Sequence, residues 1–145
     1  MTFLNLPLVS ISWSDAVLAG WIALGGGAGA ALRYVVDVAV SSRWRRPFPL
    51  ATFLINLSGS LALGLLVGWF YAGEWGPGWS HAAPMIGTGL LGGYTTFSTA
   101  SYDTLRLARD ARVGMALAYA VGTMLATVLA ALLGLWLGAW WATVV

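Results

Sequence analysis

Apolar residues occur along this chain in four long stretches separated by short, more polar connections. A helix needs about 20 mostly apolar residues to cross a bilayer, and each stretch is long enough. Apolar character persists all round each stretch without an alternation of period two, which favours helices over barrel strands. The pattern therefore predicts an all-α membrane protein, a single domain over residues 1–145. Its four transmembrane helices are expected at about residues 16–40, 50–71, 82–102 and 113–141.

The composition agrees with a membrane location. Hydrophobic residues make up 59% of the chain and charged residues only 8%, whereas soluble domains carry about 25% charged residues. The absence of cysteine excludes disulfides and thiolate chemistry. The first 14 residues contain no basic residue, so they do not resemble a cleaved signal peptide. We therefore expect the first span to remain in the mature protein.

The basic residues are distributed unevenly between the two sides of the predicted bundle. All seven are arginines, and the second connection and both terminal segments contain none. Because cytoplasmic loops are enriched in basic residues, this bias predicts a plasma-membrane protein with a single orientation and both termini outside. Loop arginines do not form an extended basic face, so no nucleic-acid partner is expected. The first connection carries Arg43, Arg45 and Arg46, and the third carries Arg106, Arg109 and Arg112.

Two of the predicted helices carry polar side chains four residues apart, which places them on one helix face. A polar group inside a bilayer costs free energy unless it has a partner. Two interpretations stay open: hydrogen bonds that join helices or return to their own carbonyls, and a polar path for an ion. The second span carries Thr52, Asn56 and Ser60, and the fourth carries Tyr119, Thr123 and Thr127.

The third span is a poor helix in its middle, because Gly92 and Gly93 are followed by a run of threonine and serine. We predict that this helix is broken near the midplane of the membrane. Non-helical backbone at that depth must be buried in protein or line a cavity. The ends of the two half-helices would then present carbonyls, which suit a small cation, and N–H groups, which suit an anion.

Arg33 is the basic residue that lies well inside a predicted span. A central arginine costs about 2.5–3.5 kcal/mol on membrane-insertion scales. In one interpretation its side chain extends toward the arginine-rich side and pairs with Asp37, four residues later. In the other it belongs to a vestibule that attracts anions.

Three motifs together resemble those of the Fluc or CrcB family of small fluoride channels. They are residues 26–34 (GGAGAALRY), 52–60 (TFLINLSGS) and 92–99 (GGYTTFST), and the resemblance extends over about residues 20–140. It implies an antiparallel dimer with two pores at the subunit interface and passive export of toxic fluoride. The chain's partners would be fluoride, membrane lipid and a second subunit.

The resemblance also implies roles for individual residues. Asn56 would hydrogen-bond fluoride, and Phe97 would present the electropositive edge of its ring to the ion. The backbone carbonyls of Gly92 and Thr95 would hold a structural sodium ion at the dimer centre. The expected pathway residues are Arg33, Thr52, Asn56, Phe97, Ser98, Thr99, Tyr119 and Thr123.

One position departs from the family pattern. The family usually has a second phenylalanine three residues after the first, and this chain has Ala100 there. Either the pore is altered, or a partner chain supplies the missing ring. The one-sided arginine distribution favours the second explanation, an antiparallel heterodimer with an oppositely oriented homologue.

Other functional classes fit the sequence less well. A proton-coupled drug exporter needs a carboxylate embedded in the membrane, whereas Glu74 lies in a connection and Asp37 near a span end. An enzyme is not expected, because no nucleophile, base and orienting group occur together. A non-conducting structural subunit of a membrane complex remains a further alternative.

Overall fold

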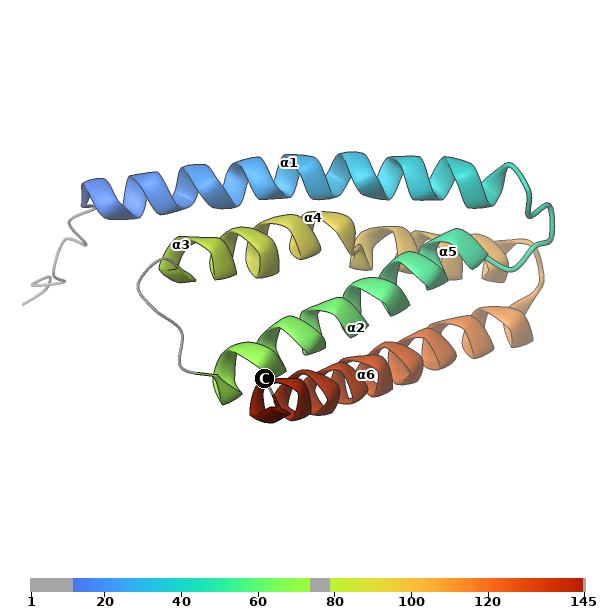
Figure 1. Cartoon of the computed structure of the whole chain (residues 1–145). Coiled ribbons are helices and arrows are strands. Elements are labelled where there is room, and N and C mark those ends of the chain that lie inside the picture. The colour runs from blue at the N-terminus through green and yellow to red at the C-terminus, as the bar shows by residue number, and fades with distance from the viewer. Residues whose placement is uncertain (1–11, 74–78, 145) are drawn as a thin grey trace, which may run out of the picture.

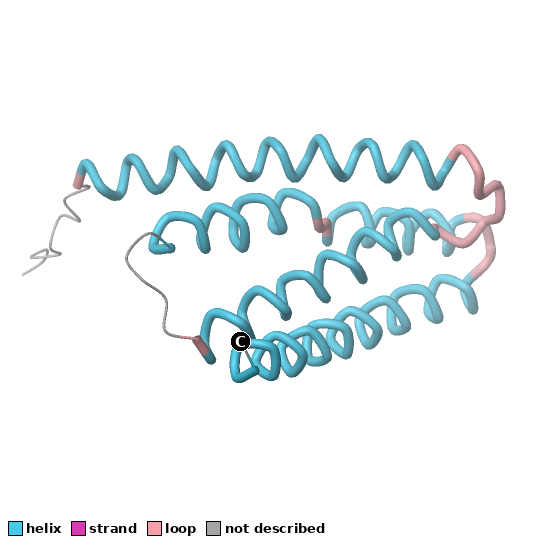
Figure 2. Tube along the Cα trace, viewed as in Figure 1, coloured by secondary structure: helices cyan, strands magenta, loops and turns pink. Residues whose placement is uncertain are grey.

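The computed structural model describes residues 12–73 and 79–144, and every regular element in these ranges is helical (Figures 1 and 2). The all-α prediction is therefore confirmed. The expectations for residues 1–11 and for Glu74 lie outside the described residues. The helices are α1 (Trp13–Ser41), α2 (Leu50–Ala72), α3 (Trp79–Pro84), the π-helix η1 (Met85–Leu91), α4 (Gly92–Tyr94), α5 (Phe97–Arg109) and α6 (Val113–Val144).

Three helices, α1, α2 and α6, are long and apolar enough to cross a membrane. The residues of the predicted third span, 82–102, are instead divided among α3, η1, α4 and α5, and α5 continues beyond that range to Arg109. Helix α1 begins at Trp13 because Ser12 and Asp15 form a capping box. In it, the Ser12 N–H donates to Asp15 Oδ2 at 2.9 Å, and the Asp15 N–H donates to Ser12 Oγ at 3.2 Å.

Glycines explain the close packing of α2 on α6. A Cβ added at Gly64 or Gly68 would overlap a backbone carbonyl of α6, and a Cβ at Gly134 or Gly138 would overlap a carbonyl of α2. Small residues four apart let helix backbones approach closely in lipid, where no hydrophobic effect drives helices together. The glycine pairs therefore allow α2 and α6 to approach each other closely, one pair from each helix.

A second glycine contact joins α1 to the helical stretch that precedes α5, and Figure 1 shows α1 running alongside it. Gly25 and Gly29 of α1 face the backbones of η1 and α4, where an added Cβ would overlap carbonyls of Met85 and Leu90. Gly93 of α4 faces the backbone of α1 in the same way. The bundle thus consists of α1 against η1 and α4, and α2 against α6, with α5 also packed on α6.

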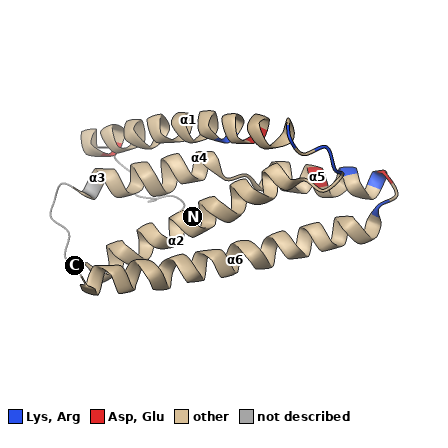
Figure 3. Ribbon diagram, turned by 45° about the vertical axis from the view of Figure 1, so that its right-hand side comes forward, with Lys and Arg blue, Asp and Glu red and all other residues tan. Residues whose placement is uncertain are grey.

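The two arginine-bearing connections lie at the same end of the bundle (Figure 3). One joins α1 to α2 and the other joins α5 to α6. The C-terminal end of α6 and the start of α3 lie at the opposite end (Figure 1). All the arginines other than Arg33 therefore lie toward one end of the molecule, although Arg106 and Arg109, expected in the third connection, belong to the last turn of α5.

Candidate functional site

The helical stretch that starts at α3 is interrupted at Thr95 and Thr96, about midway between Trp79 and Arg109. Thr95 has a ψ of 160°, and Thr96 has a φ of −151° and a ψ of 122°, so both residues are extended. The Thr96 side chain then caps α5 by accepting a hydrogen bond from the Thr99 N–H at 3.2 Å. Gly92 and Gly93, which favour helix poorly, directly precede this interruption.

The buried side chain of Asn56, on α2, holds the extended segment. Its Oδ1 accepts a hydrogen bond from the Thr96 N–H at 2.8 Å, and its Nδ2 donates to the Thr96 carbonyl at 2.9 Å. The amide therefore gives the Thr96 N–H the partner that the interrupted helix does not supply, and it also binds the carbonyl of the same residue. One N–H of the amide is not needed for this arrangement and remains for another acceptor.

Arg33 approaches the same segment from α1. Its Nη1 donates to the Thr95 carbonyl at a long 3.4 Å. The proposed pairing with Asp37 is wrong, because among the described residues the two side chains form no ion pair. Asp37 instead accepts a hydrogen bond from Ser41 Oγ at 3.2 Å. A long arginine side chain reaches several partners, and here the interrupted backbone is the one that it contacts.

A cavity of about 700 Å³ opens between α2, α5, α6 and the stretch before α5. We call it the inner cavity. Within the described ranges no charged residue lines it. Its donors are amide and hydroxyl groups, and its lining includes Asn56, Gly92, Thr95, Phe97, Ala100, Tyr119 and Thr123.

Two hydroxyls at the inner cavity, those of Tyr119 and Thr123, are buried without a well-formed hydrogen bond among the described residues, although the Tyr119 hydroxyl lies near that of Thr52. Tyr119 is only 1% exposed and Thr123 only 7%. Thr127, the third member of this stripe, donates to the carbonyl of Met124 at 3.0 Å and so returns to its own helix. Buried polar groups normally have partners, so the two free hydroxyls indicate a place where a polar ligand is expected.

A second cavity, of about 370 Å³, lies nearer the arginine-rich end, and we call it the outer cavity. Its lining includes Thr52 and Thr99, and four charged residues: Asp37, Arg46, Asp103 and Arg106.

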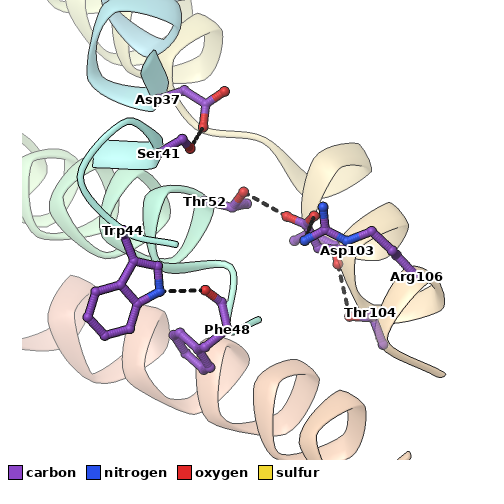
Figure 4. A network of polar contacts seen from close by, with 9 residues as sticks. Asp37, Ser41, Trp44, Phe48, Thr52, Asp103, Thr104 and Arg106 are labelled. Atoms are coloured by element: carbon purple, nitrogen blue, oxygen red, sulfur yellow. Dashed lines mark hydrogen bonds and ion pairs between the residues drawn. The ribbon is translucent and has the colours of Figure 1, made fainter. Parts of the chain in front are cut away.

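At the outer cavity Thr52 Oγ1 donates to Asp103 Oδ2 at 2.8 Å, and Arg106 Nη2 lies 3.2 Å from Asp103 Oδ1 (Figure 4). Sequence reasoning missed Asp103, because the predicted third span ended at residue 102. A signal was present, since Asp103 follows Thr99 by four residues and Thr96 by seven, which places all three on one helix face.

The structure divides the expected pathway residues among three surroundings. Thr52 and Thr99 line the outer cavity, and Arg33 and Ser98 line neither cavity. Ser98 Oγ lies 3.2 Å from Thr96 Oγ1 instead. The inner cavity brings together Asn56, Phe97, Tyr119 and Thr123, with both expected sodium positions, Gly92 and Thr95.

Comparison with known proteins agrees with the resemblance found in the motifs. Residues 20–135 match the family described as "CrcB-like protein, Camphor Resistance (CrcB)". A relative from Frankia casuarinae, named "Fluoride-specific ion channel FluC 1", is 45% identical over 105 residues, covering 70% of this chain and 81% of the relative. A protein of the same name from Leifsonia xyli is 45% identical, covering 71% and 73%. "Fluoride-specific ion channel FluC" from a Methylobacterium species is 43% identical, covering 71% and 81%. This chain therefore belongs to the CrcB-like family.

Proposed function

We propose that the chain is a subunit of a channel that conducts fluoride passively, with the inner cavity as part of its pathway. The names of its relatives support the ion. The observation that carries the proposal is a pair of buried hydroxyls, those of Tyr119 and Thr123, which form no well-made hydrogen bond to any described residue and lie in the same cavity as the Asn56 amide. Fluoride gives up water only where hydrogen-bond donors replace it, and these groups are donors.

The surroundings of these donors suit an anion that must also leave again. A cavity without charged residues lets an ion bind weakly at successive sites, as conduction requires. Helix α5 begins at Phe97, so its positive N-terminal end lies at the interruption and favours negative charge there. Lined by amides, hydroxyls and a helix N-terminus, the inner cavity favours a small anion over a cation.

In this proposal two chains complete the pathway as an antiparallel dimer. Phe97 lines the inner cavity and is nevertheless 88% exposed in the single chain, so the cavity is open on the side where a second subunit would pack. The interruption at Thr95 and Thr96 lies near the midplane, and the arginine-rich end faces the cytoplasm. A passive anion pathway in this position lets a cell lose fluoride.

The interrupted helix also fits a structural sodium ion. In a continuous helix the Thr96 N–H would donate to the Gly92 carbonyl, but here it donates to Asn56. Gly92 is also exposed, so its carbonyl is available to a cation. The Thr95 carbonyl is shared with Arg33 through a long bond. Unwound carbonyls of this kind hold sodium in other membrane proteins, and the carbonyls of two chains would make a fuller set than those of one.

The partner in this proposal is a homologue of opposite orientation. Ala100 lines the inner cavity, where the family pattern has a phenylalanine, and all the arginines other than Arg33 lie toward one end. The chain reconstituted alone should therefore give little fluoride efflux, and addition of an oppositely biased homologue should restore it. Full efflux from the chain alone, in a single orientation, would contradict the heterodimer but not the channel.

Asn56→Asp tests the pathway. We expect it to abolish fluoride efflux from liposomes, because a carboxylate repels the anion and cannot donate to it. The carboxylate would also face the Thr96 carbonyl, so detergent size-exclusion and circular dichroism must show that the variant folds and assembles. A folded, assembled Asn56→Asp protein with normal fluoride efflux would rule out the assignment.

One observation bears on a proton-coupled exporter. Asp103 is a buried carboxylate next to the pathway, the kind of group that sequence reasoning did not find. It is, however, paired with Arg106 and bonded to Thr52, which suits a fixed carboxylate better than one that exchanges protons. Fluoride efflux that continues after a proton gradient is collapsed would favour the channel, whereas transport that requires the gradient would favour the exporter.

A further inference from the structure

We propose that the outer cavity is the access chamber through which anions reach the pathway from the arginine-rich end, and that Arg106 is the residue that lets them pass Asp103. This inference rests on the fluoride pathway proposed above. It assigns a role to the charged residues of the outer cavity, which the pathway through the inner cavity does not explain.

The two cavities lie in sequence along the same two helices. On α2, Thr52 lines the outer cavity and Asn56, one turn later, lines the inner cavity. On α5, Thr99 and Asp103 line the outer cavity, and their neighbours Ala100 and Thr104 line the inner one. An ion that passes the hydrogen bond between Thr52 and Asp103 therefore arrives beside Asn56.

A carboxylate stands at the boundary between the two cavities. Asp103 is 7% exposed, and both of its oxygens have partners, Thr52 and Arg106 (Figure 4). An unpaired carboxylate in this position would repel every approaching anion. Arg106 neutralises it, and the Arg106 side chain is still 48% exposed toward the end from which anions arrive. The pair therefore presents a positive group in front of a negative one.

Arg46 adds a second fixed positive charge to the outer cavity. Its guanidinium carbon lies 5.2 Å from the centre of the Trp44 ring, a cation–π contact. Trp44 is itself anchored, because its Nε1 donates to the Phe48 carbonyl at 2.9 Å (Figure 4). Among the described residues the other charged group that lines this cavity is Asp37, so two arginines face two aspartates and their charges sum to zero. Such a chamber attracts anions at its arginines without trapping them.

A purely structural ion pair would behave differently. A pair three residues apart on a helix, with a half-exposed arginine, adds little stability. If that were its whole role, loss of Arg106 would change conduction no more than loss of a neighbouring surface arginine. If Arg106 neutralises Asp103 for the passing ion, conduction should depend on the balance of charge between the two residues.

The test compares Arg106→Gln, Arg106→Lys and the double variant Arg106→Gln/Asp103→Asn, each in the full chain and in the assembly that conducts. Fluoride efflux from liposomes is measured with a fluoride electrode. We expect Arg106→Gln to lower efflux about tenfold or more, because the buried carboxylate is then unpaired. Arg106→Lys should keep most of the efflux, and the double variant should recover it, because it removes both charges together.

Arg109→Gln is the matched control, since it makes the same charge change on α5 at an exposed residue outside both cavities. It should conduct like the unaltered protein. Equal efflux from Arg106→Gln and Arg109→Gln would overturn the inference while leaving the fluoride pathway intact. A double variant that conducts no better than Arg106→Gln would also overturn it. Absence of efflux from the unaltered assembly would instead contradict the proposed function.

Discussion

The two cavities share helices α2 and α5 but differ in their chemistry. The outer cavity is lined by four charged residues. One of them is the buried Asp103, both of whose carboxylate oxygens have partners. The inner cavity has no charged lining residue in the described part of the chain, and two of its hydroxyls have no partner. A charge deep in a membrane protein is costly and binds a counter-ion tightly, whereas near the end of a bundle it is hydrated. In the proposed pathway the outer cavity therefore attracts the anion by charge, and the inner cavity conducts it past neutral hydrogen-bond donors.

The largest expected effect comes from placing a charge where the molecule has none. Thr123→Asp should lower fluoride efflux about a thousandfold, because two like charges 4 Å apart repel by about 4 kcal/mol at an effective dielectric constant of 20. Thr123→Asn introduces a side chain with the shape of aspartate but without its charge, and it should conduct within about tenfold of the unaltered protein. The same aspartate placed in the outer cavity, Ser41→Asp, should change efflux only a few-fold, since hydration weakens the repulsion to about 1 kcal/mol.

Equal losses in Thr123→Asp and Ser41→Asp would remove the distinction between the cavities. It would then be simpler to treat them as one continuous, uniformly polar passage. Liposome efflux of all three variants, normalised to the amount of assembled protein, decides between the two descriptions.

A smaller effect is expected from removing the free donors one at a time. Tyr119→Phe and Thr123→Val should each lower fluoride efflux about ten- to a hundredfold, because a hydrogen bond to a charged group contributes about 1.5–3 kcal/mol. Thr123→Val should not destabilise the fold, since the Thr123 hydroxyl has no partner to lose among the described residues. Tyr119→Phe loses only a weak interaction with the Thr52 hydroxyl, so its effect on stability should be small. Thr123→Ser keeps the donor and serves as the control for flux.

The stability of these variants distinguishes a role of the hydroxyls in the fold from a role in binding the ion. Loss of an ordinary buried hydrogen bond costs about 1 kcal/mol, and unfolding in detergent would detect it. Destabilised Tyr119→Phe and Thr123→Val proteins with unchanged efflux would show that the hydroxyls serve the fold and not the ion.

Much of this arrangement could be predicted from the sequence, because lipid imposes a simple pattern. Long apolar runs predicted the helices, and the glycine and threonine cluster after Leu91 marked the weak point of the third one. The stripe with Asn56 was predicted from spacing alone. Its specific partner, the backbone of Thr96, was not, because forty residues separate the two and only packing brings them together.

The missing parts of the prediction have physical causes. Asp103 was overlooked because hydropathy places span ends only approximately, and the residue lay just beyond the boundary. Arg33 was assigned a partner on its own helix, where spacing is easily read, but its side chain reaches the Thr95 carbonyl on another helix. The division of the polar residues between two cavities depends on how α5 packs among α1, α2 and α6, which no local pattern reveals.

The most direct measurement compares two halides in the same vesicles. Liposomes that contain the conducting assembly are loaded with fluoride or with chloride, and efflux is followed with the matching electrode under valinomycin. Rapid loss of fluoride and retention of chloride is the expected result, because amide and hydroxyl donors form stronger hydrogen bonds with the smaller, more charge-dense ion. Equal loss of both ions, or retention of both by a folded and assembled protein, would contradict a fluoride pathway through the inner cavity.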